Sequence, residues 1–599
     1  MMIARPARRG PVVGLLLTAL LLFGCSDSPD APLFVDVQPL VDACIASAGA
    51  RAASCTAQCQ RLGDETAMAE CNTVCEADQD TEASQCTAVN LDALTQFCAT
   101  GDCSQQVGQC LAESATVYDG CAAGCASDNA FCGNRCLDAR AIAETACAYR
   151  PAVVLAGSPM LPALPQGEPA VLEGVLDADE LAVVMAADEA AGTHRQRDVI
   201  LVVDDPGADV VITQVAHHFR FGVPLDSREF DEGDGRLAFY GDIARPQANL
   251  LVAETSLKWR NTERERDNLT FDLADFEIDW AESLGFDVKA HVLLWGNPQP
   301  LASGSGTPDW LLEAFPGREL DASERAALNA LIEQRIRAVV GRYRGRIDVW
   351  EVTNEMLNPI TSWFVDRLGP TVVNDAFAWA RVADPGAELV YNEWIADIFT
   401  GLGGPDAVAV RDRVLALLAE GVQVDALGQQ GHFAPGLVNV GIDEGLDERT
   451  RVDDYAAALA TLAETGLPIH ITEVTFAAPQ DPEQRAAQAE AVMRLWWGHP
   501  QVEEIIFWNF WNPLGPRSRL DLGLYDDAGN LSRHGEVIFS LLNDRWRTRL
   551  TAASNATGAI EFRGTLGDYV AQWDTPEGPV FTRFEVPPGE GPYRVVLAR

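Results

Sequence analysis

The chain has 599 residues, with 88 Asp and Glu against 44 Lys and Arg, and its formal charge is −44. This length predicts roughly two to four domains. A strongly acidic surface repels nucleic acid and anionic lipid headgroups, so both are excluded as partners. A solvated acidic surface that aids solubility explains the charge most simply, and adaptation to a saline setting is the alternative.

Residues 1–24 resemble a bacterial lipoprotein signal peptide. Three arginines precede an apolar run at 12–23, which is too short to span a bilayer comfortably. The following L-F-G-C resembles a lipobox and predicts lipidation of Cys25. We therefore expect a membrane contact through the lipid anchor only, in the bacterial cell envelope at the outer membrane or cell surface. Plain secretion with cleavage nearby is the alternative.

Residues 25–150 contain all 15 cysteines, and without Cys25 their number is even. Twelve of them form two sets with the same outer steps of 11 residues and the same flanking C-x3-C pairs. On a helix, steps of 4 and 11 residues advance about 40° and 20° past whole turns, so three cysteines share one face. Two antiparallel helices in each set predict a helical hairpin with three disulfide rungs. The predicted pairs are Cys44–Cys86, Cys55–Cys75, Cys59–Cys71, Cys110–Cys147, Cys121–Cys136, Cys125–Cys132 and, as the remainder, Cys98–Cys103.

Spacing alone does not fix disulfide connectivity, so these pairs rest on the helical geometry. Disulfides persist in exported proteins, whereas a zinc site is the weaker alternative because this module has no histidine. Aromatic residues are scarce in the module, which argues against a sugar-stacking platform. A spacer or adhesion module is the simplest interpretation.

Residues 151–213 are expected to be a linker with two lead-in strands at 199–203 and 210–214. Residues 214–548 then alternate apolar strand-like runs with amphipathic stretches, which is typical of a (β/α)8 TIM barrel of the α/β class. The eight predicted strands are 219–223, 250–255, 288–295, 347–355, 388–394, 426–432, 469–474 and 504–510. The predicted helices are 273–284, 324–340, 372–382, 407–419, 454–465, 482–496 and 535–542.

Residues 549–599 read as short strands separated by Gly and Pro. The predicted strands are 559–563, 569–573, 580–584 and 593–598. They form a small β appendage, for which pairing with the lead-in strands is one option.

Polar and aromatic side chains cluster where the predicted barrel strands end. Active sites of TIM barrels lie at that face, so these residues are expected to converge on one site. The group comprises Glu254, His291, Trp295, Asn354, Glu355, Asn392, Gln430, His432, Glu473 and Trp508.

Six short motifs, which occur along the chain in the order found in the family, resemble glycoside hydrolase family 10, the endo-β-1,4-xylanase family. The resemblance covers residues 194–545. W-E-V-T-N-E at 350–355 is similar to the family's W-D-V-V-N-E, and I-T-E-V-T at 471–475 to I-T-E-L-D. Three further motifs are K-W-x-x-x-E, which begins at Lys258, H-x-L-x-W, which begins at His291, and D-x-x-G-x-Q-x-H, which begins at residue 425. Trp508 lies where the family has a tryptophan on strand eight. G-H-F at 431–433, T-G-L-P-I at 465–469 and G-T-L-G-D-Y at 564–569 resemble plant-type members.

The resemblance implies that Glu355 is the acid/base and Glu473 the nucleophile of a retaining hydrolase that cleaves internal β-1,4 bonds of xylan. Glycoside cleavage needs two carboxyl groups, and about 5–5.5 Å between them allows a covalent intermediate. Glu355 should start protonated, with its pKa raised by burial and by the charge on Glu473.

The resemblance also implies a substrate-binding set around these two glutamates. Asn354 would bind the sugar 2-OH, and Gln430 and His432 would orient the nucleophile. The remaining members are Glu254, Lys258 and His291 for sugar hydroxyls and Trp295 and Trp508 for apolar sugar faces.

Several positions depart from the family pattern and leave the exact substrate open. Thr255, Gly296, Pro298 and Thr475 replace more polar residues, Glu393-Trp394 replaces Asp-Tyr, and N-F-W-N-P follows Trp508. A hydrolase of another β-glycan or of short xylo-oligosaccharides is one alternative, and a non-catalytic glycan-binding lipoprotein is another. The mechanism calls for no metal and no cofactor, while a structural calcium and the oligomeric state stay open.

Overall fold

A computed structural model describes residues 168–597, apart from 231–235, 299–305, 396–404, 434–449, 478, 480, 514–521 and 577. The predicted signal segment 1–24, the lipidation site Cys25 and all the predicted disulfides, from Cys44–Cys86 to Cys110–Cys147, lie outside the described residues. Among the described residues, no helix combines the length and apolar character needed to cross a membrane.

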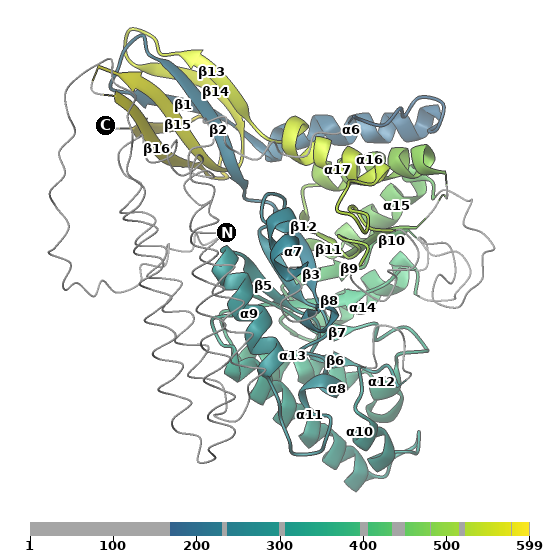
Figure 1. The fold of residues 1–599 in the computed structure, drawn as a ribbon. Coiled ribbons are helices and arrows are strands. Elements are labelled where there is room, and N and C mark those ends of the chain that lie inside the picture. The colour runs from purple at the N-terminus through teal and green to yellow at the C-terminus, as the bar shows by residue number, and fades with distance from the viewer. Residues whose placement is uncertain are drawn as a thin grey trace, which may run out of the picture. The chain divides into compact units, whose positions relative to one another are not determined.

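Eight parallel strands close into a barrel, which confirms the predicted fold class (Figure 1). Adjacent strands pair in chain order, and the pairing of β9 with β11 and of β12 with β3 completes the circle. Most strand residues are buried, as expected where helices cover a parallel sheet. The barrel strands are β3 Arg220–Leu225, β4 Leu250–Ala253, β5 Asp287–Ala290, β7 Val349–Asn354, β8 Glu388–Glu393, β9 Ala426–Gln429, β11 Ile469–Phe476 and β12 Val502–Phe507, extended by short β6 Leu294–Trp295 and β10 His432–Phe433.

Helices connect these strands around the outside of the barrel, and several begin with a side-chain cap that satisfies free backbone N–H groups. Asp321 and Glu324 form a capping box on α11, and Asp481 caps α16. The helices of the barrel are α7 Arg236–Ala244, α8 Trp259–Thr262, α9 Asp272–Leu284, α10 Asp309–Ala314, α11 Ala322–Arg342, α12 Trp363–Leu368, α13 Thr371–Ala383, α14 Ala407–Ala419, α15 Val452–Ala463, α16 Pro482–Gly498 and α17 Arg533–Ser540, which continues as a π turn, Leu541–Arg545.

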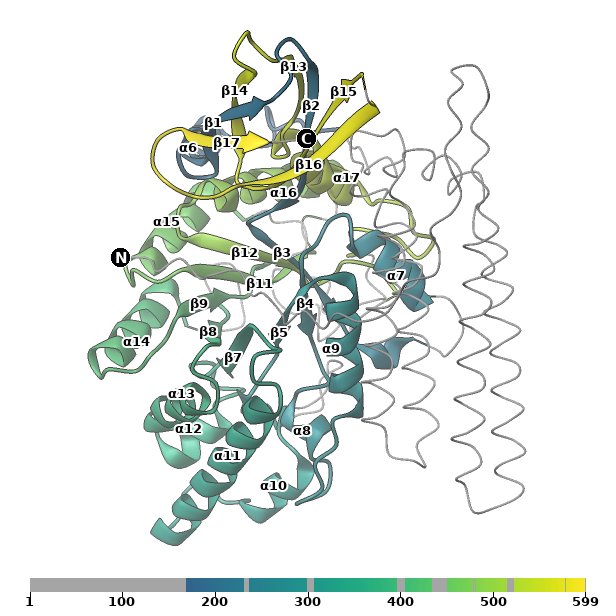
Figure 2. The ribbon, with the colours of Figure 1, turned by 90° about the vertical axis from the view of Figure 1, so that its left-hand side faces the viewer.

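Strands from both ends of the described chain form a β-sandwich, drawn edge-on in Figure 2. The predicted pairing of the appendage with the lead-in strands is therefore confirmed. One sheet has the order β14-β1-β17 and the other β13-β2-β15-β16, around a shared apolar core that includes Trp573 and Tyr569. The strands are β1 Gln196–Val203, β2 Asp209–His217, β13 Arg549–Ala553, β14 Ala559–Thr565, β15 Gly567–Thr575, β16 Gly578–Val586 and β17 Tyr593–Leu597.

A helix that the sequence pattern did not predict, α6 Ala178–His194, precedes β1 and packs on α15 and α16. Its capping box is formed by Asp177 and Glu180. The buried Glu180 carboxylate also accepts a hydrogen bond from the backbone N–H of Val452, 3.0 Å away, where α15 begins. One side chain thus links the starts of two helices.

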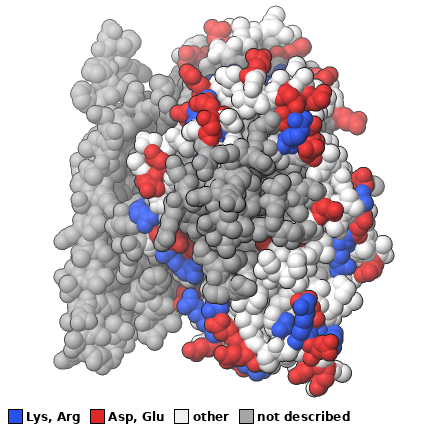
Figure 3. Space-filling view, turned by 90° about the vertical axis from the view of Figure 1, so that its right-hand side faces the viewer, with Lys and Arg blue, Asp and Glu red and all other residues white. Residues whose placement is uncertain are grey.

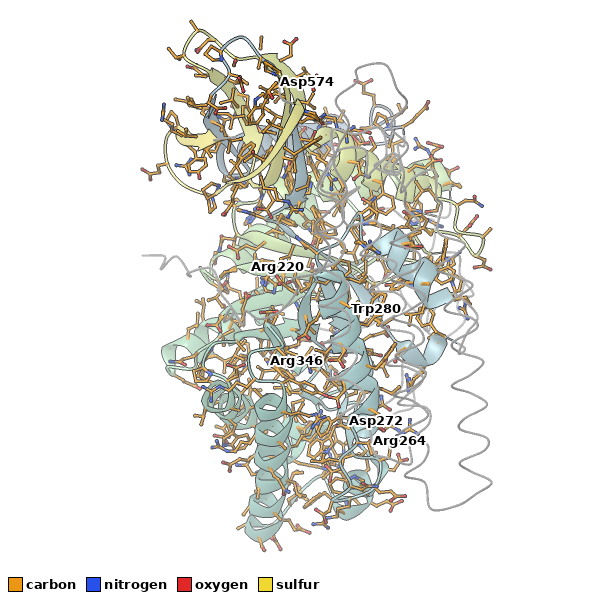
Figure 4. All side chains as sticks on the ribbon, turned by 60° about the vertical axis from the view of Figure 1, so that its left-hand side comes forward. Arg220, Arg264, Asp272, Trp280, Arg346 and Asp574 are labelled. Carbon is orange, nitrogen blue, oxygen red and sulfur yellow. The ribbon has the colours of Figure 1, made fainter. Side chains whose placement is uncertain are left out.

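The interior of the barrel holds a column of charged side chains in addition to apolar ones. Lys289 on β5 lies 2.5 Å from Glu504 on β12 and 3.4 Å from Glu351 on β7. At the first residue of β3, Arg220 (labelled in Figure 4) pairs with Glu504 at 3.2 Å and with Glu388 at 2.9 Å. The contacts of Lys289 with Glu504 and of Arg220 with Glu388 join strands that are not neighbours in the sheet, so these side chains point inward. The column ends at Glu351, next to the carboxyl ends of the strands.

On the face drawn in Figure 3, acidic and basic side chains of the described residues lie in mixed groups. Elsewhere among the described residues, Arg346 pairs with Glu282 at 2.8 Å and Arg318 with Asp366 at 2.7 Å. The acidic excess of the chain is thus partly offset locally by arginine.

Candidate active site

All ten predicted catalytic and binding residues lie at or just beyond the carboxyl ends of barrel strands. Glu254 follows β4, His291 follows β5, Trp295 ends β6, and Trp508 follows β12. The remaining members are Lys258 at the start of α8, Asn354 and Glu355 at the end of β7, Gln430 and His432 beyond β9, and Glu473 within β11. The topology therefore brings segments more than 200 residues apart, such as those of Glu254 and Trp508, to one mouth.

Glu473 is held as a carboxylate by two neighbouring side chains. Its Oε2 lies 3.1 Å from Nε2 of His432, and its Oε1 accepts a hydrogen bond of 3.2 Å from Nδ2 of Asn392. Burial raises the pKa of this carboxyl, but the His432 hydrogen bond and the positive charges of His432, His291 and Lys258 together lower the pKa to about 2. Glu473 is therefore ionised at neutral pH.

Glu355 follows β7 in the left-handed backbone region, with φ of 56°. A non-glycine residue rarely adopts this conformation, which places its side chain away from the regular strand direction. Two hydrogen bonds stabilise it, from the Glu355 N–H to the Asn392 carbonyl at 3.0 Å and from the Thr361 hydroxyl to the Glu355 carbonyl at 2.8 Å. The Glu355 carboxylate also accepts bonds from Gln430 Nε2, at 3.0 Å, and Asn358 Nδ2, at 3.3 Å.

The two glutamates have opposite pKa shifts. Desolvation raises the pKa of Glu355, the charge of Glu473 raises it further, and the Gln430 hydrogen bond only partly opposes these effects. One carboxyl thus favours its protonated form and the other its ionised form. Carboxyl pairs whose environments separate their pKa values in this way are suited to divide acid and nucleophile roles.

Asn392 lies between the two glutamates and was not in the predicted binding set. Its Nδ2 contacts Glu473, Asn354 Oδ1 at 3.0 Å and Glu351 at 3.3 Å, and its Oδ1 accepts a bond of 2.8 Å from Thr472. A Cβ at Gly428 would collide with this side chain, so glycine leaves room for it. The position of Asn392 at the end of β8, in line with the other polar strand ends, was the available signal.

The side chain of Gln430 contacts Glu355, although the sequence predicted a contact with Glu473. Its side chain reaches Glu355 and Asn354, whereas its backbone carbonyl accepts the Glu473 N–H at 2.7 Å. Because Asn354 Oδ1 already accepts bonds from Gln430 and Asn392, its Nδ2 group faces the Glu355 carboxylate, at 3.5 Å. This amide N–H pair is the part of Asn354 available for a sugar hydroxyl.

Glu254, Lys258 and two tryptophans form a second buried group beside the glutamates. Lys258 Nζ lies 5.1 Å above the ring of Trp295, and the His291 ring meets the Trp508 ring edge to face at 5.5 Å. Burial raises the pKa of Glu254 to about 7, against the opposing effect of Lys258. A small pocket beside Glu254 and Trp508 is lined also by Asp226, Tyr240 and Trp511. The mixture of polar groups and aromatic faces fits the two kinds of surface that a sugar ring presents.

Arg335 on α11 fixes the loop that carries Lys258, and sequence reasoning did not identify it. Its guanidinium donates to the carbonyl of Leu257 at 2.7 Å, the hydroxyl of Thr262 at 2.9 Å and the carbonyl of Leu293 at 3.3 Å. Burial lowers the pKa of this arginine to about 9. A helical pattern could not distinguish it from the exposed arginines of the same helix.

His291, Glu351 and Glu473 each place one ligand-type atom within 4.8 Å of the others, which is close enough for a shared metal ion. His291 Nδ1, however, lies 2.6 Å from Glu351 Oε2, and both oxygens of Glu473 are hydrogen-bonded. These bonds already use the atoms that a metal would need, and they explain the proximity of the three residues.

Two further polar groups complete the surroundings of the glutamates. The buried Glu393 carboxylate accepts the Leu357 N–H at 3.0 Å, behind the turn that follows Glu355, and burial raises the pKa of Glu393 well above its usual range. Thr475 contacts His432 from the opposite side to Glu473. Both positions had been recognised only as departures from a family pattern.

A closed (β/α)8 barrel with two carboxyl groups of opposite pKa shift at its mouth is the arrangement expected of a glycoside hydrolase. The family model for glycosyl hydrolase family 10 matches residues 212–514, about half of the chain. This chain belongs to glycosyl hydrolase family 10.

Curated relatives extend the similarity beyond the family segment. The anti-sigma-I factor RsgI6 of Acetivibrio thermocellus is 29% identical over 391 residues, covering 64% of this chain and 45% of that protein. Endo-1,4-beta-xylanase 1 of Arabidopsis thaliana is 26% identical over 405 residues, covering 66% of this chain and 38% of that protein. The chain thus spans less than half the length of both relatives.

Two solved structures are similar to part of this chain. Native xylanase 10B from Thermotoga maritima is 24% identical with a TM-score of 0.45, and covers 55% of this chain and 96% of its own. Xylanase 10B from Thermotoga petrophila, solved with xylobiose, is 23% identical with a TM-score of 0.44, and covers 55% of this chain and 95% of its own.

Proposed function

We propose that the protein is a retaining endo-1,4-β-xylanase, with Glu355 as the acid/base and Glu473 as the nucleophile. The observation that carries this proposal is the pair of glutamates at one barrel mouth with opposite pKa shifts. Membership of family 10 and the named xylanases among the relatives support xylan as the substrate.

The proposed reaction has two displacements. A Glu473 oxygen attacks the anomeric carbon while Glu355 gives its proton to the departing sugar oxygen, which leaves a glycosyl ester on Glu473. Since the ester removes the charge of Glu473, the pKa of Glu355 falls. Glu355 then accepts a proton from the water that attacks the anomeric carbon, and Glu473 is released as a carboxylate.

Product analysis on xylan tests this proposal. The unmodified chain is expected to release short oligosaccharides with retained anomeric configuration, and Glu473→Ala to lose at least roughly 10⁴-fold in kcat. Full hydrolysis by Glu473→Ala would remove the nucleophile assignment. Binding of xylan without hydrolysis by the unmodified chain would favour a non-catalytic glycan-binding role, and cleavage of a different β-glycan alone would correct the substrate.

The cellular setting is part of the proposal and is supported by the sequence of the first 25 residues. A lipid on Cys25 would hold the enzyme at the cell envelope, with the cysteine-rich segment as a spacer. Cys25→Ala is expected to move the protein from the membrane fraction to the soluble one, whereas an unchanged membrane fraction would contradict the lipid anchor.

A further inference from the structure

Behind the proposed nucleophile, a row of three buried polar side chains joins three strand ends. His432 faces Thr475 across the parallel pairing of β10 and β11. The His432 Nδ1 lies 3.0 Å from the Thr475 hydroxyl oxygen, which lies 2.8 Å from Oδ1 of Asn509. The exposed fractions of His432, Thr475 and Asn509 are 5%, 1% and 7%, so water does not replace these contacts.

The two nitrogens of His432 meet different kinds of partner. Nε2 faces the ionised Glu473 and therefore carries a proton, since a carboxylate only accepts hydrogen bonds. Nδ1 faces a hydroxyl, which accepts a bond from Nδ1–H when the imidazole is cationic and donates to bare Nδ1 when it is neutral. Asn509 suits both cases, because its amide can present an oxygen or an NH₂ group to Thr475.

The charged groups that face Glu473 and His432 come from several elements. Glu473 itself lies on β11, while His291 and Lys258 contribute positive charge to the Glu473 carboxylate. Glu355 and Glu254 are the neighbouring acidic groups, and the charge of Glu473 acts on both. A neutral hydroxyl at Nδ1 adds no fixed charge to this balance, whereas a carboxylate there would favour the cationic ring.

We propose that Thr475, supported by Asn509, is a positioning residue that lets His432 adopt both the neutral and the cationic form, so that the charge of His432 follows the charge of Glu473. The inference rests on the proposed nucleophile role of Glu473. With Glu473 ionised, the cationic ring is favoured. With Glu473 neutral, as in a glycosyl ester, the neutral ring keeps both its bonds by accepting from Thr475. A carboxylate in place of Thr475 would hold the cation in both states.

The pKa of His432 in the full-length chain tests this inference without any measurement of activity. Histidine-labelled protein is titrated by NMR, and His432→Gln identifies the His432 signal. Thr475→Asp is expected to raise the pKa of His432 by about 1–3 units, because an opposite charge then lies beside Nδ1. Asn509→Asp is expected to raise it less, since the hydroxyl intervenes, and Thr475→Ser, which keeps the hydroxyl, is the matched control with no shift.

Glu473→Gln imitates the neutral ester and completes the test. In this variant the pKa of His432 is expected to fall by about 1 unit or more, and the fall should be smaller when Thr475→Asp is also present. An equal fall in both backgrounds, or an unchanged pKa in folded Thr475→Asp, would overturn the inference. If Thr475→Asp does not fold, two other variants provide the test. The pKa of His432 is then expected to rise in Asn509→Asp and to fall in Thr475→Val. An unchanged pKa of His432 in both variants would overturn the inference.

The pH dependence of kcat/KM on xylan gives the functional readout. Thr475→Asp should move the pH profile, whereas Thr475→Ser should leave it in place. A loss of activity at every pH with an unmoved profile would indicate a merely structural role. A chain that does not hydrolyse xylan but shows the expected His432 shifts would contradict the proposed function and leave this inference standing.

Discussion

Two buried groups of charged side chains share one barrel and differ in how completely their charges are matched. In the interior column, acids and bases alternate in contact, with Lys289 and Arg220 on either side of Glu504. Although burial alone would raise the pKa of Glu504, His470, Lys289 and Arg220 lower it. Every described acid of the column thus has a basic partner within 4 Å, as the pairs of Glu351, Glu388 and Glu504 demonstrate.

At the mouth, carboxyl groups outnumber the basic groups that could neutralise them. Glu254, Glu355 and Glu393 all have raised pKa values because desolvation exceeds the effect of their partners. Of these four glutamates, Glu473 alone has a lowered pKa, of about 2. In one scaffold, contacting bases thus keep the carboxyls of the column ionised, while burial favours the protonated form of three glutamates at the mouth.

Replacing the protonated carboxyl at the mouth should have the largest effect. Glu355→Gln keeps the shape but cannot give or accept the proton, so kcat on xylan is expected to fall by about 10²–10⁴-fold. An aryl xyloside with an acidic phenol as leaving group needs no proton, so its first step should lose far less. Equal losses on both substrates would contradict the acid role. Circular dichroism and thermal unfolding establish that the variant is folded.

Breaking the charge pairs of the interior column should lower the free energy of unfolding more than it lowers the catalytic rate. Lys289→Met leaves Glu504 and Glu351 without their shared cation, and we expect a loss of about 3–5 kcal/mol in the free energy of unfolding, measured in urea. Adding Glu504→Gln removes a carboxylate that has lost one of its two cationic partners, Arg220 being the other, and should restore part of the loss. If Lys289→Met were as stable as the unmodified chain, charge matching would not explain this column.

A third change concerns Glu277 of α9, an unmatched carboxyl just outside the mouth. It accepts the Ser227 N–H at 2.8 Å and contacts the Ser256 hydroxyl at 2.5 Å, and burial raises its pKa from 4.5 to about 8. The folded state therefore keeps a proton that the unfolded state loses, so this group's stabilisation is complete below pH 4.5 and is lost as pH rises to about 8.

Glu277→Gln imitates the protonated carboxyl and should remove this dependence. Its free energy of unfolding, measured in urea, is expected to equal that of the unmodified chain in acid and to exceed it increasingly with pH, by up to about 1.4 kcal/mol per pH unit. A difference that stays constant with pH would mean that Glu277 is ionised in the folded protein.

The sequence predicted the barrel strands well because they are continuous apolar runs, whereas the short helices α7, α10 and α12 were not predicted. The bounds of α14, 407–419, agree with the prediction, and each barrel strand lies within a few residues of its predicted range. Helix α6 was missed because its buried stripe consists of Glu180, Val184, Ala187 and Ala191, which hardly differ from its exposed face. Small residues bury too little area to produce a distinct pattern.

The candidate site was predictable only in part, for a different physical reason. The two glutamates stand in recognisable motifs at strand ends, and the barrel topology brings such ends together. The contacts of Asn392, Arg335 and Thr475 depend on which side chains meet between different strands and loops. A local sequence pattern carries no information about such contacts. The Gln430 side chain illustrates this limit, because its position was predicted but the glutamate it contacts was not.

The β-sandwich places a constraint on the order in which the chain folds. Asp198 of β1 pairs with Arg563 of β14, 365 residues later, so β1 and β2 have no sheet partners until the last part of the chain has been synthesised. Since domains fold as the chain emerges from the ribosome, the barrel can form while β1 and β2 are still unpaired. The sandwich then joins the start of the barrel to its end, and a chain truncated before β13 would leave the edges of β1 and β2 open to pairing between molecules.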